Sequence, residues 1–256
     1  MTEPSSPGTP RNSLSVLRYR DYAIFWGAAL VSNTGSWMQS IAAPFVIYQL
    51  TRSTTWLGVA AFMAFFPALL MGPLAGSLAD RYPRKTILLY TQSAMMLAAF
   101  ALWGAWVAGV ATPAVIVALL SLSGIASGLN ITAWQSFVPQ LVPRTELLHA
   151  VRVNSMQFVA GRAFGPALAG LVLQVYGAGT AFLLNALSFL LVLAALVAIH
   201  PREVAVDAQA GRVRDHFKEA VRYVRARQAV YLPVLTITAV SFFGSSMVQL
   251  VPAFAE

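Results

Sequence analysis

The sequence predicts an all-α polytopic membrane protein, and three observations lead to that fold class. Of the 256 residues, 58% are hydrophobic and only 10% are charged, and the mean hydropathy is +0.68. Soluble domains carry about a quarter charged residues, so this chain cannot cover itself with a water-facing surface. The charges are also confined to short stretches between long apolar runs. A lipid bilayer is therefore the expected surroundings of the chain.

Charge-free runs mark the helices in order along the chain. Roughly 20 apolar residues cross the hydrocarbon core of a bilayer as a helix. The runs that end at Arg52 and Asp80 hold one helix each, and the run from Lys85 to Arg144 holds two, with a turn at 109–113. Helices are expected at about 23–50, 55–79, 86–108, 113–137, 152–175, 180–199 and 230–254.

Lys and Arg give the orientation of these helices. Fifteen of the 17 basic residues fall in the gaps that lie on one side, whereas the opposite side has Arg52 alone and Arg162 lies within a helix. The positive-inside rule therefore places the N-terminus in the cytoplasm. The expected organisation is a disordered cytoplasmic tail at 1–21, a six-helix transmembrane bundle at 22–199, a basic cytoplasmic linker with an amphipathic helix at 200–229, and a seventh transmembrane helix at 230–256.

Several functional classes are disfavoured. The net charge is +8, but its placement between apolar runs argues against a nucleic-acid partner. There is no cysteine, hence no disulfide or thiol metal site, and no metalloprotease, nucleophile-elbow or P-loop pattern occurs. The three histidines have no second ligand at useful spacing. We therefore expect no enzyme activity, no metal and no bound cofactor, and the bilayer as a partner.

A charged turn at 76–85, with the sequence GSLADRYPRK, connects the second and third expected helices. It resembles the loop between helices two and three of the major facilitator superfamily, Gly-x-x-x-Asp-Arg-x-Gly-Arg-Arg/Lys, with Pro83 in place of the second glycine. The matching residues are Gly76, Asp80, Arg81, Arg84 and Lys85. Gly76 would let another helix approach closely, and Asp80 could face a helix N-terminus or pair with Arg84. The resemblance implies a latch that holds the outward-open state; the plain alternative is a charged turn that ends two helices.

A second motif, GRAFGPALAG at 161–170, lies in the fifth expected helix. It is similar to the fifth-helix pattern of the superfamily's drug and proton antiporters through Gly161, Gly165, Pro166 and Gly170. Small residues at this spacing form a packing groove, and Pro166 bends the helix. The resemblance implies export, whereas generic helix packing would need the same residues. A related Gly-Pro segment at 72–76 hints at two three-helix units of opposite orientation, a 3+3 inverted repeat.

Nearly the whole chain resembles the enterobactin-exporter-like branch of the superfamily, through residues 32–39, the 76–85 turn, 142–155 and 250–254. Members have two six-helix halves, so the chain corresponds to an N-terminal half plus helix seven. The C-terminal half is expected in the same or a partner chain. The proton-motive force is expected as the energy source from this resemblance alone, because no Asp or Glu lies within an expected span.

The candidate substrate pathway consists of polar residues within the expected helices. Its members are Asn33, Gln39, Ser123, Ser127, Asn130 and Arg162. Polar groups in hydrocarbon need partners, so a water-filled path and hydrogen bonds between helices both explain such residues. Arg162 has two interpretations: attraction of an anionic substrate or a gating ion pair, and snorkelling toward the cytoplasmic interface.

These observations together predict a secondary active transporter of the bacterial inner membrane. We expect it to export amphiphilic small molecules, of the siderophore or drug type, by alternating access. Two alternatives remain open at the sequence level. One is an uptake permease on the same fold, and the other is a truncated membrane fragment without autonomous transport.

Overall fold

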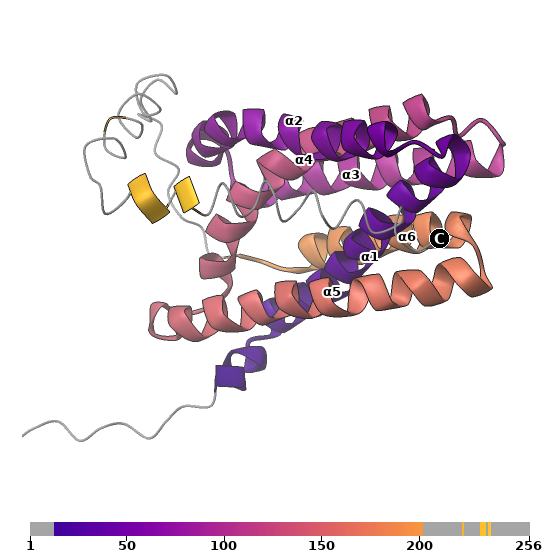
Figure 1. The fold of residues 1–256 in the computed structure, drawn as a ribbon. Coiled ribbons are helices and arrows are strands. Elements are labelled where there is room, and N and C mark those ends of the chain that lie inside the picture. The colour runs from indigo at the N-terminus through magenta and orange to yellow at the C-terminus, as the bar shows by residue number, and fades with distance from the viewer. Residues whose placement is uncertain (1–12, 202–221, 223–230, 234, 237–256) are drawn as a thin grey trace, which may run out of the picture.

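The computed structural model describes residues 13–201, 222, 231–233, 235 and 236, and these fold into a bundle of long helices (Figure 1). The expected linker and seventh helix lie almost wholly outside the described residues. The elements are η1 (Ser13–Arg18), α1 (Arg20–Thr51), α2 (Thr54–Arg81), α3 (Arg84–Val107), α4 (Pro113–Phe137), η2 (Val138–Leu141), η3 (Arg144–Glu146), α5 (Leu147–Val175) and α6 (Ala178–Ala198).

Local chemistry explains where several of these helices begin and end. The Thr112 side chain accepts a hydrogen bond from the Val115 amide, and Pro113 occupies the first turn of α4, where a missing N–H costs nothing. Arg52 ends α1 in the left-handed conformation, with φ of 50°. Gly177, with φ of 80°, makes the turn between α5 and α6.

Two sequence-based boundaries are wrong. The segment expected as a disordered tail up to residue 21 already contains η1, because Val16 is fully buried against the bundle, and α1 begins at Arg20. The stretch expected as a loop at 138–152 instead forms η2, η3 and the first turn of α5. Val138 and Val142 anchor it in the core. Helix α5 therefore begins five residues earlier than expected.

The packing of the six long helices repeats after three helices. Helix α1 packs on α5 and α6, α4 packs on α2 and α3, and α3 packs on α6. Exchanging α1, α2 and α3 with α4, α5 and α6 leaves this pattern unchanged. Three helices per unit start successive units on opposite sides of the membrane, so the units are inverted. The 3+3 inverted repeat is confirmed, and α1 crosses the bundle obliquely in Figure 1.

Five segments of the described chain are long and apolar enough to cross a membrane, and they correspond to α2 to α6. Helix α1, with 32 residues, is long enough but more polar. Its middle third, residues 32–40, carries serine, asparagine, threonine and glutamine. The side chains of Ser32 and Gln39 are nevertheless buried inside the bundle. Helix α1 is thus long enough to span a membrane, and other helices shield Ser32 and Gln39 in its middle third.

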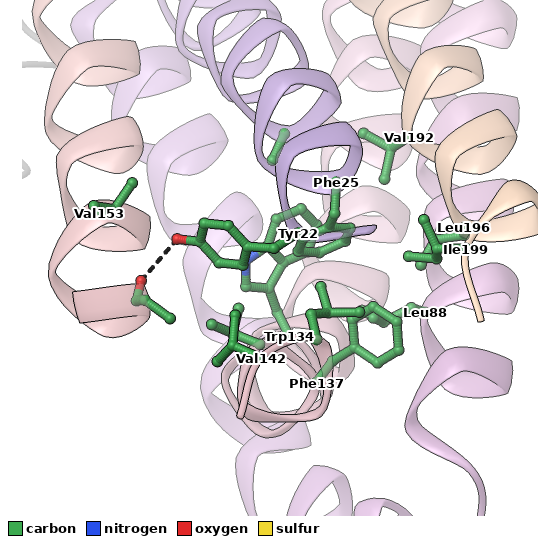
Figure 2. Close-up of a cluster of buried hydrophobic side chains, with 14 of the residues drawn as sticks. Tyr22, Phe25, Leu88, Trp134, Phe137, Val142, Val153, Val192, Leu196 and Ile199 are labelled. Atoms are coloured by element: carbon green, nitrogen blue, oxygen red, sulfur yellow. Dashed lines mark hydrogen bonds between the residues drawn. The ribbon is translucent and has the colours of Figure 1, made fainter. Parts of the chain in front are cut away.

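The core has two large apolar clusters, one toward each end of the bundle. The first, which we call the charged-end cluster, is shown in Figure 2 and includes Val16, Tyr22, Phe25, Leu88, Trp134, Phe137, Val142, Val153, Val192, Leu196 and Ile199. The Tyr22 hydroxyl donates a hydrogen bond to the Ala150 carbonyl (2.8 Å) and so ties α1 to α5. The second, the far-end cluster, includes Met38, Ala42, Val46, Ile47, Leu57, Leu102, Ile116, Ala169 and Phe182.

Polar contacts join the elements at the end of the bundle that holds the charged-end cluster, which we call the charged end. Arg18 donates to the Glu146 carboxylate (3.1 Å), which is 1% exposed, and so joins η1 to the start of α5. Lys85 Nζ donates to the Ile199 carbonyl (2.9 Å) just after α6. The His200 amide donates to the Asp21 carboxylate (3.1 Å). A cation at a helix C-terminus complements its unpaired carbonyls, so Lys85 stabilises the end of α6.

The α2–α4 interface gives a stability prediction. A Cβ added at Gly128 would lie 2.6 Å from the Ala68 carbonyl oxygen, whereas one added at Gly104 of α3 would meet nothing within 4 Å. Gly128→Ala should therefore destabilise the bundle by about 1–3 kcal/mol through overpacking. The control Gly104→Ala should be neutral or slightly stabilising, since alanine favours helix. Thermal unfolding of the detergent-purified variants measures both, and equal melting temperatures would contradict the α2–α4 packing.

Candidate functional site

A cavity of about 280 Å³ lies among α1, α2, α4 and α6, with Met95 of α3 also at its wall. Its polar lining consists of Ser36, Gln39, Ser40, Ser123, Ser127 and Asn185. Its larger apolar lining residues are Trp37, Pro44, Phe65, Met95, Leu120 and Phe189. Among the described lining residues, none carries a charged side chain. The cavity therefore offers hydroxyl and amide groups beside aromatic surface.

Helix α1 supplies much of this wall. Pro44 lies inside α1 and lacks the N–H that would bond the Ser40 carbonyl, so that carbonyl keeps acceptor capacity beside the cavity. Across the cavity, Gly124 of α4 lies against the Ala64 carbonyl of α2, where a Cβ would collide. This close approach of α2 to α4 fixes one wall of the cavity.

Two amide side chains join α1 to α6 at the cavity. Asn185 Nδ2 donates to Gln39 Oε1 (2.8 Å), and the Ser36 hydroxyl lies 3.4 Å from Asn185 Oδ1. Gly35 permits this contact, because a Cβ there would meet Ser188 Oγ at 2.8 Å. The amides of Gln39 and Asn185 are thus held in fixed orientation at the cavity wall.

A second chain of polar contacts joins α1, α5 and α4. Asn33 Nδ2 donates to Gln157 Oε1 (2.6 Å), and the Gln157 side chain is fully buried. Gln157 Nε2 lies 3.4 Å from Asn154 Oδ1, which also accepts from Trp134 Nε1 (3.3 Å). The Asn33–Gln157 and Gln39–Asn185 pairs form a polar layer between the charged-end and far-end clusters.

The expected substrate pathway divides into three groups. Gln39, Ser123 and Ser127 line the cavity. Asn33 and Asn130 do not: Asn33 pairs with Gln157, and Asn130 donates to Thr91 Oγ1 of α3 (2.9 Å). For these two asparagines, hydrogen bonding between helices explains their presence in the membrane. Arg162 lies outside the cavity lining, next to Trp37.

The wall residues that sequence reasoning missed include Phe65, Met95, Asn185 and Phe189. The available signal was Asn185, the one amide in the apolar sequence of α6. Trp134 and Met38 belong to the two apolar clusters, whereas Trp37 lines the cavity.

Two residues of the helix-five motif at 161–170 pack against α1. Gly161 lies against Asn33, and Gly165 lies against Trp37 and the Thr34 carbonyl, so a Cβ at either position would crowd α1. A Cβ at Gly170 would meet nothing within 4 Å. The groove predicted from the motif thus exists at its first two glycines. Pro166 lies inside α5, directly after Gly165.

The charged turn is resolved into the end of α2 at Arg81 and the start of α3 at Arg84. The Asp80 side chain lies outside the described part of the structure. No described residue lies within 4 Å of a Cβ added at Gly76, so the close helix approach expected there is not made within the described chain. Lys85 bonds the end of α6, and the buried Arg84 Nε finds no hydrogen-bond partner among the residues that the structure describes.

Arg162 lies at the middle of α5 because that helix begins at Leu147. Its side chain is exposed, and its guanidinium carbon lies 5.4 Å from the centre of the Trp37 ring. Among the described residues, no carboxylate forms an ion pair with it. The same residues contain no group of three His, Asp or Glu side chains that could hold a metal ion.

Two inverted three-helix units with a cavity at mid-bundle define one half of a major facilitator transporter. The sequence comparisons agree with this class. The model of the transmembrane secretion effector family matches residues 11–256, and the chain belongs to that family of the major facilitator superfamily.

Among its relatives, the staphyloferrin A transporter of Staphylococcus aureus is 27% identical over 225 residues, which cover 85% of this chain and 56% of the relative. An uncharacterised MFS-type transporter of Bacillus subtilis, YfiS, is 25% identical over 83% of this chain and 51% of its own length. The enterobactin exporter EntS of Escherichia coli is 28% identical over 59% of this chain and 36% of its own length. The chain spans about half the length of the first two. The family and these relatives are transporters, which fits the expectation that the chain is not an enzyme.

The Asn33–Gln157 pair gives a test of the polar layer. Replacing either residue by Leu removes the hydrogen bond between them and leaves the other amide without that partner inside the bundle, so each single change should cost about 1–2 kcal/mol of stability. The double variant Asn33→Leu/Gln157→Leu should cost less than the sum, because it leaves neither partner behind. A double-mutant cycle on detergent unfolding measures the coupling; strictly additive costs would show that the pair does not join α1 to α5.

Proposed function

We propose that the chain is part of a secondary active transporter that exports amphiphilic small molecules of the siderophore or drug type. The observation that carries the proposal is the uncharged cavity at mid-bundle, where Ser, Gln and Asn side chains face aromatic surface. Such a lining suits a ligand with both apolar and hydrogen-bonding parts. The names of two relatives, a staphyloferrin A transporter and an enterobactin exporter, support the siderophore class.

The proposed mechanism is alternating access. A second six-helix half, in the same chain or in a partner, would close the cavity on its open side, and the two halves would rock around it. The turn at 76–85 would act as a latch on the outward-open state, with Asp80 as its anion. We propose the proton-motive force as the energy source.

The proposed location is the bacterial inner membrane with the N-terminus in the cytoplasm. Arg18, Lys85 and Arg144 lie at the charged end of the bundle, whereas Arg52 lies at the opposite end. This asymmetry supports a cytoplasmic charged end under the positive-inside rule.

Export is proposed over uptake for two reasons. Gly161 and Gly165 pack α5 tightly on α1, in the pattern that resembles antiporters of the superfamily. One relative is named as an exporter. Neither observation involves the substrate itself, so direction needs a direct transport measurement.

Energised vesicles give that measurement. Everted inner-membrane vesicles that carry the product of the complete reading frame should accumulate a fluorescent amphiphile such as fluorescein or rhodamine 123 when respiration starts. A protonophore should abolish the accumulation. Asp80→Asn should slow it about tenfold or more at equal protein level, if a charge-assisted contact of the usual strength holds the latch.

Opposite results have distinct meanings in this assay. Accumulation only in right-side-out vesicles would reverse the direction and support an uptake permease. Equal dye content with and without the protein would contradict transport of these amphiphiles. Full activity of Asp80→Asn would remove the latch from the mechanism while leaving export intact.

A further inference from the structure

We propose that Arg162 and Trp37 form an anion-recognition element beside the cavity, so that the substrate carries a carboxylate or another oxyanion next to its apolar part. This inference rests on the proposed transport function and assigns a charge class to its substrate. It places the anion at Arg162 of α5 and the uncharged part of the substrate in the cavity.

The position of Arg162 favours an anionic partner. It lies 15 residues after the start of α5 and 13 before its end, which corresponds to about 20 Å of helix on either side. A guanidinium at this depth is costly in hydrocarbon and needs a partner or a water-filled cavity. The other Lys and Arg residues within 13–201 lie at or near helix ends or in turns. Arg162 is therefore the one cation at mid-depth within residues 13–201.

The contacts of Arg162 leave its hydrogen-bonding capacity available. Within the described part of the chain, its polar side-chain interaction is with the ring of Trp37, 5.4 Å from the guanidinium carbon to the ring centre. Cation–π attraction of this kind orients the guanidinium without using its N–H donors. Those five donors form a planar fork that matches an oxyanion. Trp37 thus acts as a positioning residue, and Arg162 supplies the charge.

Trp37 connects this cation to the cavity. It is a lining residue, and its neighbours Ser36 and Ser40 on α1 are lining residues too. Gly165 of α5 lies against the Trp37 Cβ and leaves no room for a side chain of its own there. Helices α1 and α5 therefore hold Trp37 between the cavity and Arg162.

The two sites have complementary chemistry. The cavity lining carries hydroxyl, amide and aromatic groups and no charge, whereas Arg162 carries a charge that no described carboxylate neutralises. An uncharged aromatic or hydrogen-bonding group fits the cavity, and an anionic group attached to it fits Arg162. The geometry therefore favours an amphiphilic anion over a neutral or cationic amphiphile.

Snorkelling does not explain this arrangement. Arginines near helix ends extend toward the interface. The guanidinium of Arg162 instead lies over Trp37, which is itself in the middle of α1 (Arg20–Thr51). The contact keeps the charge at mid-depth, away from the lipid headgroups.

Two dyes that share a ring system but differ in charge test the inference. Fluorescein is anionic, and rhodamine 123 has the same xanthene rings with a positive charge. Binding of both is measured by fluorescence anisotropy to the product of the complete reading frame in lipid nanodiscs. The variants are Arg162→Gln, Arg162→Lys and Trp37→Phe, with Arg152→Gln as a matched control on the exposed charged end of α5.

We expect the wild-type protein to bind fluorescein about tenfold or more tightly than rhodamine 123. Arg162→Gln should weaken fluorescein binding about tenfold or more, the loss typical of one charge-assisted contact, and leave rhodamine 123 within twofold. Arg162→Lys should weaken fluorescein about threefold, because it keeps the charge and loses the planar fork. Trp37→Phe should weaken it by a factor of about two to five. Arg152→Gln should bind as the wild type does.

Three results would overturn the inference: no preference for fluorescein in the wild type, an equal effect of Arg162→Gln on both dyes, or the same loss in Arg152→Gln. Transport is scored separately in energised vesicles. Charge-selective binding without dye transport would contradict the proposed function and leave the anion site standing. Transport of both dyes with equal efficiency by wild type and Arg162→Gln would contradict the anion site and leave the proposed function standing.

Discussion

Pairing of the polar side chains of α1 is the constraint on which the rest of the bundle depends. Unpaired amides are costly in hydrocarbon. Asn33 is satisfied by Gln157 of α5, and Gln39 by Asn185 of α6. Helix α1 must therefore lie between α5 and α6, and its two apolar ends must extend into separate clusters. The polar layer between those clusters is the level at which the cavity lies.

The same arrangement relates fold to function. The inverted repeat places α1 and α4 in equivalent positions, and both contribute to the cavity wall. Glycines make the approach possible on both sides, at Gly124 and Gly128 against α2 and at Gly161 and Gly165 against α1. Gly165 also packs against Trp37, and the Arg162 guanidinium lies over the ring of that tryptophan. Close packing and a candidate binding element thus depend on the same small residues.

Sequence patterns predicted the six helices well, because long apolar runs between charges leave few alternatives. They failed at the start of α5. The charges from Arg144 to Arg152 suggested a loop, yet Glu146 is 1% exposed and paired with Arg18 and His149. That error had placed Arg162 too near the helix start. The sequence also identified Ser123 and Ser127 as candidate pathway residues. Helical periodicity predicts which face of a helix a residue lies on, but not which residue of another helix it contacts. It could not tell that Asn130 pairs with Thr91 instead of lining the cavity.

The most direct test of this account is the water accessibility of α1. These 256 residues contain no cysteine, so single cysteines can be introduced into α1 and compared with the unsubstituted protein as background. We predict that Ser36→Cys and Ser40→Cys, at the cavity wall, react with a hydrophilic maleimide in intact membranes of the complete protein. Ala29→Cys and Ala42→Cys, at fully buried positions of the same helix, should react only after denaturation. Equal labelling of all four positions, or protection of the two serine positions, would contradict a polar cavity face on α1.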